Sequence, residues 1–155
     1  MGVIDSFRGE YRFLSNFYPC PIVFEGDLYP SLEHAFQAAK SLDPNERKVV
    51  RLCAKPGDAK RAGRKVKKRE DWDDVRVGVM RELLHQKFND PQLRQRLLNT
   101  EGAELIEGND WGDVFWGVCR GRGLNWLGKL LMEVRSTLVV NSNQPSSTVG
   151  ANGGE

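Results

Sequence analysis

The chain has 155 residues, of which 39% are hydrophobic and 28% are charged, and this is the composition of one globular domain with a single core. The composition excludes the disordered and collagen-like classes, and no apolar run is long enough to cross a bilayer. The 23 Lys and Arg residues against 21 Asp and Glu leave a net charge of +2, which selects no function.

The cysteine pattern indicates a reducing environment. Cys20, Cys53 and Cys119 are odd in number and widely spaced, and no Cys or His residues have the spacing of a zinc site. Residues 1–5 lack the basic and apolar regions of a secretory signal. We therefore expect a cytoplasmic protein that needs no metal, no cofactor and no membrane.

The N-terminal part of the chain is predicted to contain short strands and one helix. Residues 11–14 are expected to be extended, and residues 22–29 to form a hairpin with its turn at 26–27. Ser31 is a suitable N-cap for a helix that runs to about Leu42.

The rest of the chain is predicted to be mostly helical. Asp43 and Asp90 are each followed by proline, a pair that suits the N-cap and first turn of a helix. The expected elements are helices from residue 44, over 58–65, over 72–88 and from residue 91, a short strand over 104–107, a glycine-rich loop over 108–123 and a helix over 125–138.

These elements predict an α+β fold. It is a predominantly helical single domain over residues 1–138, with a small antiparallel sheet near the N-terminus. Residues 139–155 are polar and rich in Gly and Ser, and we expect them to form a disordered tail.

Three polar residues share one stripe of the helix that follows Ser31. Glu33, Gln37 and Lys40 are four and three residues apart, so that a carboxyl, an amide and an amine face the same way. Such a set can surround a sugar. The same spacing also describes an exposed polar ladder on a surface helix, and spacing alone favours the ladder.

The segment over residues 107–117 combines acidic residues and glycines with Trp111 and Trp116. A tryptophan ring can stack on a base while a neighbouring carboxylate such as Asp113 binds or activates a polar group. The alternative is that both tryptophans fill the core and the glycines serve turns.

Two segments have features that attract phosphates. Residues 47–69 are strongly basic, with Asp58 as the only acid between the two end residues, although a solvated helical face is an equal alternative. Residues 121–125 place glycines before the last helix, where backbone amides suit an anion. A glycine-rich helix start without a ligand is at least as common.

The order of the motifs along the chain resembles the YbiA-like (NADAR) family. The motifs that carry the resemblance are Leu14-Ser15-Asn16-Phe17, Tyr29 to Lys40, Ala62-Gly63-Arg64, Asp71-Trp72-Asp73, Met80 with Lys87-Phe88, Leu97 to Thr100, Leu105-Ile106-Glu107, Asp113 to Gly117 and Asn125 to Arg135. Together they span about residues 5–138. The segment 118–122 departs from the family pattern, because it is shorter and richer in arginine, and it leaves the substrate contacts open.

The resemblance implies a mostly helical α+β fold and N-glycosidase chemistry. Members of the family hydrolyse the N-ribosyl bond of early intermediates of riboflavin biosynthesis, or remove ADP-ribose from guanine in nucleic acid. The expected partner is therefore a small-molecule nucleotide substrate or ADP-ribosylated nucleic acid. A non-catalytic module that binds ADP-ribose is the alternative from another class.

The resemblance also implies functional residues, namely Glu33, Lys40, Trp72, Asp113 and Trp116. We predict that Glu33, Lys40 and Asp113 are catalytic, with Glu33 as a general acid/base and Lys40 either attacking C1′ or binding the ribose. The predicted substrate-binding residues are Asn16, Phe17, His34, Gln37, Arg64, Trp72, Trp116, Arg122 and Asn125. The two arginines of this set are expected to bind phosphate.

Overall fold

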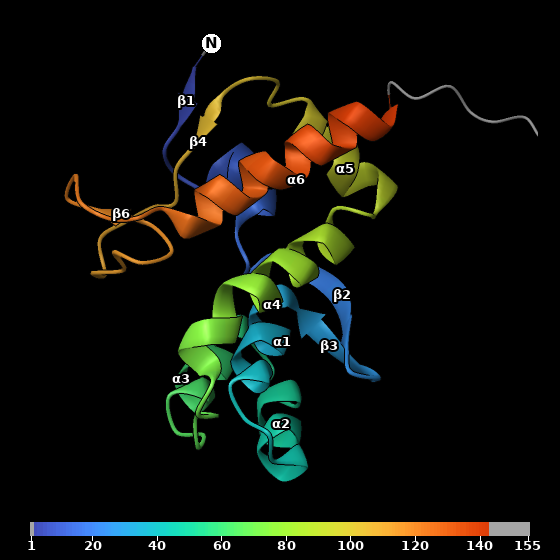
Figure 1. Ribbon diagram of the computed structural model, residues 1–155, viewed down its shortest axis with the longest axis vertical. Helices are drawn as coiled ribbons and strands as arrows, with labels where there is room; N and C mark the ends of the chain where they lie inside the picture. Colours follow the sequence, from blue (N-terminus) through green and yellow to red (C-terminus); the bar gives the residue numbers. More distant parts are fainter. Residues whose placement is uncertain (1, 143–155) are drawn as a thin grey trace, which may run out of the picture.

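The computed structural model describes residues 2–142 and shows a mostly helical body with three short two-stranded sheets. The α-helices are α1 (Leu32–Ala39), α2 (Pro44–Arg51), α3 (Pro56–Gly63), α4 (Trp72–Lys87), α5 (Pro91–Leu98) and α6 (Trp126–Ser142). Helices α1, α2 and α3 gather at one end of the molecule and α5 and α6 at the other, while α4 lies between them and packs against both α1 and α6 (Figure 1). The prediction of a predominantly helical α+β fold is confirmed.

The antiparallel sheet near the N-terminus is also confirmed. Strands β2 (Pro19–Phe24) and β3 (Asp27–Ser31) form a hairpin, and Ile22 of β2 is completely buried. Its two turn residues are Glu25 and Gly26, with φ angles of 47° and 87°, one position earlier than we predicted. Positive φ at both positions gives the turn the twist that matches the paired strands.

The prediction that residues 11–14 are extended is wrong. They belong to the 3-10 helix η1 (Gly9–Leu14), which begins at a glycine with a φ angle of 58°. The consecutive residues Phe13 and Leu14 are both buried, whereas a strand sends successive side chains to opposite faces. The core therefore takes up both side chains through a helical turn.

Two parallel strand pairs join segments that are distant in the sequence. β1 (Val3–Ile4) pairs with β4 (Glu104–Leu105), and β5 (Gly108–Asn109) pairs with β6 (Val118–Cys119). Neither pairing was predicted, because two-residue strands have no alternation to detect. The pairs hold Glu107, between β4 and β5, in a defined position.

Helix α1 is the most buried helix of the fold. It begins as predicted, with Oγ of Ser31 accepting a hydrogen bond from the backbone N–H of His34 (3.2 Å), but it ends at Ala39 and not at about Leu42. All eight of its residues are buried, including Glu33 and Gln37. An exposed polar ladder on this helix is thereby excluded.

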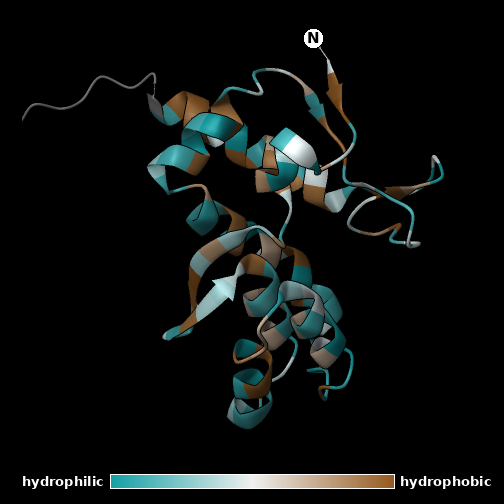
Figure 2. Cartoon of the chain, turned by 180° about the vertical axis from the view of Figure 1, so that it is seen from behind, coloured by the Kyte–Doolittle hydropathy of each residue, from teal (hydrophilic) through white to brown (hydrophobic). Residues whose placement is uncertain are grey.

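Helix α6 is longer than predicted. It continues to Ser142, so residues 139–142, which we assigned to the tail, are helical, since no Gly or Pro interrupts this part of the chain. The remaining part of the predicted tail, residues 143–155, lies outside the described residues. Figure 2 shows that α6 carries both hydrophobic and hydrophilic residues, and its buried hydrophobic side chains are Leu127, Leu130, Leu131 and Val134.

Candidate active site

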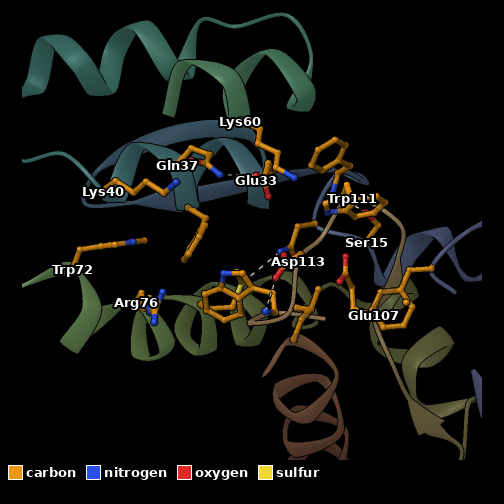
Figure 3. A pocket seen from close by; sticks show the side chains of 18 of the residues that line it. Ser15, Glu33, Gln37, Lys40, Lys60, Trp72, Arg76, Glu107, Trp111 and Asp113 are labelled. Atoms are coloured by element: carbon orange, nitrogen blue, oxygen red, sulfur yellow. Dashed lines mark hydrogen bonds between the residues drawn. The ribbon is translucent and has the colours of Figure 1, made fainter. Parts of the chain in front are cut away.

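A pocket of about 420 Å³ lies where α1, α3 and α4 meet the loop before the hairpin and the glycine-rich loop after β4. Among the side chains labelled in Figure 3, Glu33 and Asp113 lie in the middle, Lys40, Trp72 and Arg76 lie toward one end, and Glu107, Trp111 and Ser15 lie toward the other. We call these two ends the lysine end and the Glu107 end. The volume suits a ligand of the size of a mononucleotide.

The polar stripe of α1 lines this pocket. Glu33 and Gln37 are 6% and 5% exposed, and Nε2 of Gln37 donates a hydrogen bond to Oε1 of Glu33 (2.7 Å). Gly63 of α3 makes this arrangement possible. A Cβ at position 63 would lie 2.8 Å from Cδ of Gln37 and closer still to its Oε1. The Ala-Gly-Arg motif around Gly63 therefore has a packing reason, which is to admit the side chain that holds Glu33.

Burial shifts Glu33 and Lys40 in opposite directions. Burial raises the pKa of Glu33 above the usual carboxyl value and outweighs the hydrogen bond from Gln37 and the attraction of Lys60 and Lys40. Burial lowers the pKa of Lys40, and the positive charge of Lys68 adds to this effect, while Glu33 opposes it. Both groups are thus moved toward their uncharged forms, an amine and a carboxylic acid on one helix face.

Asp113 is held rigidly at the opposite wall. Its Oδ1 accepts hydrogen bonds from the backbone N–H groups of Phe115 (3.1 Å) and Trp116 (2.8 Å). Asn109 completes the support, since its Oδ1 accepts from the backbone N–H of Asp113 (3.0 Å) and its Nδ2 donates to the carbonyl of Asp113 (2.8 Å). These bonds keep the carboxylate directed at the pocket (Figure 3).

Aromatic side chains form the walls. The Phe36 ring lies 5.1 Å from the Trp72 ring and 5.3 Å from the Trp116 ring, measured between centroids, and all three residues line the pocket. Trp72 is buried and Trp116 packs against the core, so both rings serve the core and the pocket together. Trp111 differs, because it is 53% exposed at the Glu107 end, with Nζ of Lys60 5.4 Å from its ring centroid.

The cations of the pocket are Arg8, Lys40, Lys60, Lys68 and Arg76. The guanidinium of Arg76 lies over an aromatic ring, with Cζ 3.6 Å from the centroid of Phe115. The carboxylate of Asp73 approaches it only to 3.9 Å, and its buried Nε has no hydrogen-bond partner among the described residues. A guanidinium held in this way keeps donors available for an anionic ligand.

The structure brings together eight of the predicted site residues around this pocket. They are Asn16, Phe17, Glu33, Gln37, Lys40, Trp72, Asp113 and Trp116. Asn16 also supports α1 directly, because its carbonyl accepts the backbone N–H of Glu33 (3.1 Å).

Two further predicted residues do not line the pocket and have internal partners instead. His34 is 1% exposed, with Nε2 donating to the carbonyl of Cys53 (2.9 Å) and Nδ1 lying 2.6 Å from Oγ of Ser31. Oδ1 of Asn125 accepts a hydrogen bond from the backbone N–H of Glu107 (3.0 Å), and its Nδ2 donates one to the carbonyl of Leu105 (2.9 Å). Their geometry is that of structural residues.

The two arginines that we expected to bind phosphate are also outside the pocket. Arg64 is exposed at the C-terminus of α3, and Arg122 is exposed in the loop after β6. Arg76 was missed, although a signal was present. Trp72, Arg76 and Met80 are spaced by four residues on α4, which places them on one face of the helix, and all three line the pocket.

The structure adds two observations on partners. Across residues 2–142, none of the helices combines the length and the apolar character needed to cross a membrane. Over the same residues, no cluster of three or more His, Cys, Asp or Glu side chains is arranged to hold a metal ion.

Known proteins show the same sequence pattern and fold. The sequence model of the NADAR domain family matches residues 5–139 of the chain. The chain is 41% identical over 135 residues to N-glycosidase YbiA of Escherichia coli (strain K12), and the aligned region covers 84% of each chain. It is 42% identical over 134 residues to a riboflavin biosynthesis protein of Vibrio vulnificus (strain YJ016), covering 83% of this chain and 36% of that longer one.

The solved structure of Escherichia coli YbiA, determined by NMR, has the same fold. It superimposes with a TM-score of 0.80 at 35% identity, over 95% of this chain and 94% of that one. The shared fold, the sequence identity and the match over nearly the whole described length agree. The chain belongs to the NADAR family.

Proposed function

We propose that this chain is an N-glycosidase that hydrolyses the bond between C1′ of a phosphorylated ribose and a nitrogen of a base. One observation carries the proposal: the amine of Lys40 and the carboxyl of Glu33 share a pocket, and burial shifts both toward their uncharged forms. The names of the relatives, N-glycosidase and riboflavin biosynthesis protein, support it.

Lys40 acts as the nucleophile in this proposal. Its uncharged amine attacks C1′, the base leaves, and the ring-opened sugar remains attached to Nζ as a Schiff base until water releases it. The lowered pKa of Lys40 favours this role, because an ammonium ion has no lone pair with which to attack. Glu33, seven residues earlier on the same face, transfers protons between Lys40, the sugar and water.

Asp113 and the aromatic walls position the sugar. The carboxylate of Asp113 is held by two backbone N–H groups, which suits it to accept a ribose hydroxyl or to stabilise positive charge at C1′. Trp72 and Trp116 exclude water around the reacting carbon. Arg76 with Lys68 at the lysine end binds the phosphate, in place of the two arginines predicted from the sequence.

The preferred substrate is a free nucleotide, a ribosylaminopyrimidine phosphate of the riboflavin pathway. The test is product analysis by liquid chromatography and mass spectrometry with this substrate, with and without borohydride. We expect release of the base and, after reduction, a mass increase on the peptide that contains Lys40. The variants Lys40→Ala and Glu33→Gln should lose turnover, whereas Lys48→Ala, at an exposed position of α2, should retain it. Unchanged turnover in both active-site variants overturns the proposal.

A second substrate, ADP-ribosylated guanine in DNA or RNA, is favoured by the surface beside the pocket. Lys60 and Lys68 line the pocket, and the residues between them include the exposed cations Arg61, Arg64 and Lys65. Such a surface attracts a polyanion. Restoration of unmodified guanine in an oligonucleotide, with a rate that falls steeply as salt is added, is the result that selects this substrate.

We also propose a cytoplasmic location for the enzyme. Cys20, Cys53 and Cys119 are all free thiols in the fold, which is typical of a reducing compartment. Fractionation of the host cells with the chain detected by antibody tests this point.

A further inference from the structure

Glu107 is a second carboxyl of the pocket; it is half-buried and lies across from α1. Its side chain lines the Glu107 end, on the far side of Asp113 from Lys40 and Arg76 (Figure 3). The chemistry proposed above assigns it no role.

The fold holds Glu107 on every side. Its backbone N–H donates to Oδ1 of Asn125 (3.0 Å), its carbonyl accepts from the backbone N–H of Val118 (2.8 Å), and its Oε2 accepts from Nδ2 of Asn109 (3.2 Å). Gly117 leaves room for the carboxyl, because a Cβ at that position would lie 2.7 Å from Nδ2 of Asn109 and closer still to Oε2 of Glu107. A side chain fixed in this way is preorganised for one task.

The surroundings of Glu107 favour its protonated form. Burial is the main cause, and together with the negative charge of Asp113 it raises the pKa of Glu107 to about 7. The hydrogen bond from Asn109 and the ammonium of Lys60 lower it, while Glu33 on α1 raises it. These are the charged and polar groups that face the carboxyl from the glycine-rich loop, α3 and α1. At neutral pH a large fraction of Glu107 therefore carries a proton that it can give away.

We propose that Glu107 is the catalytic acid that delivers a proton to the base nitrogen as the N-glycosidic bond breaks. The proposal rests on the N-glycosidase function above and assigns the two ends of the pocket. The phosphate lies at the lysine end, and the departing base lies at the Glu107 end, beside Trp111. The exposed indole ring of Trp111 offers a flat face on which a planar base can stack.

The step balances in atoms and charge. The lone pair of Lys40 forms the Nζ–C1′ bond, the C1′–N bond breaks with its electron pair going to the base nitrogen, and the carboxyl proton of Glu107 moves to that nitrogen. Glu107 is then a carboxylate. The C1′–O4′ bond then opens, with its electron pair going to O4′ and a proton passing from Nζ to O4′ through Glu33, which gives the Schiff base C1′=Nζ. In the second half, the oxygen of a water molecule bonds to C1′ and Glu107 takes a proton from that water. The hydroxyl proton then passes to Nζ as the C1′–Nζ pair returns to Lys40, which leaves the free amine and the aldehyde of the sugar. The net change is the addition of one water across the bond.

A series of N-aryl ribosylamine 5-phosphates tests the proposal, because substituents on the ring change how readily the amine departs without changing the sugar. With an acid in place, the rate depends weakly on the substituent, and without it electron-poor amines leave far faster than electron-rich ones. We expect Glu107→Gln to lower kcat by about 10²–10⁴-fold for the electron-rich amines and much less for nitroaniline. Glu104→Gln, at an exposed position three residues earlier, is the matched control and should keep wild-type kinetics.

The pH profile gives a second readout. For the wild type, kcat/KM should fall as pH rises through about 7, since the acid must be protonated, and Glu107→Gln should lack this limb. Glu107→Asp, which keeps the carboxyl, should retain the limb at a reduced rate. An unchanged limb in Glu107→Gln, or an equal loss for all amines, overturns the proposal for Glu107. A wild type that cleaves no member of the series and no pyrimidine substrate overturns the N-glycosidase function itself.

Discussion

Replacing Gly63 with alanine should destabilise the protein and weaken its catalysis, although alanine is the better helix former. Gly63 is the last residue of α3, and Gln37 fills the space that a side chain at this position would need. Cδ and Cβ of Gln37 lie 2.8 and 2.9 Å from the position of a Cβ at residue 63. Ordinary contacts between such atoms are at least 3.4 Å, so Gln37 must move. Its hydrogen bond to Glu33 then breaks.

The magnitude follows from three contributions. Overpacking a buried contact costs about 1–3 kcal/mol. Loss of the bond from Gln37 to Glu33 leaves buried polar groups without partners and costs about 1–2 kcal/mol. The helix preference of alanine over glycine offsets up to about 1 kcal/mol. The net loss is about 2 kcal/mol, which for a domain of this size corresponds to a fall in Tm of about 6 °C.

Thermal unfolding of Gly63→Ala beside Gly78→Ala checks the reasoning. Gly78 lies within α4, and a Cβ there meets nothing within 4 Å, so its substitution should raise Tm by about 3 °C. The double variant Gly63→Ala with Gln37→Ala should be more stable than the sum of the single effects, because truncating Gln37 removes the collisions with its Cδ and Oε1 and leaves only the close contact with Cβ. A Gly63→Ala protein as stable as Gly78→Ala, with additive behaviour in the double variant, refutes the packing role of Gly63.

Three more predictions concern single residues. Lys87 is completely buried, and burial lowers its pKa to about 7. Above that pH the unfolded chain therefore binds more protons than the folded chain. The unfolding free energy relative to Lys87→Met should rise by about 2 kcal/mol from pH 7 to 9 in urea unfolding, and a constant difference contradicts this. Arg76→Gln should raise KM about tenfold or more for the phosphorylated substrate and leave the dephosphorylated one unaffected; an equal effect on both removes Arg76 from the phosphate site. Asn125→Ala should lower the unfolding free energy by about 2 kcal/mol through two lost hydrogen bonds, whereas lost turnover at an unchanged Tm would return Asn125 to the ligand site.

Local signals predicted most helix starts and the hairpin. Ser31, Asp43 and Asp90 cap their helices as expected, because capping depends on a side chain and the next few backbone N–H groups. The spacing of Glu33, Gln37 and Lys40 likewise predicted a shared face, since helical geometry alone decides which residues point the same way. The motif order predicted the family.

The tertiary structure decided what those faces meet. Spacing favoured an exposed ladder on α1, and only packing against α3 and α4 turns that stripe into a pocket wall. The same packing selects Arg76 and not Arg64 as a pocket cation, and the two-residue pairs β1–β4 and β5–β6 bring Glu107 across from Glu33. Periodicity is a property of consecutive residues, so it defines the direction of a side chain within its own element. The carboxyl groups that face Glu33 across the pocket belong to Glu107 and Asp113, which are more than 70 positions away in the sequence, and their approach depends on the free energy of the whole core.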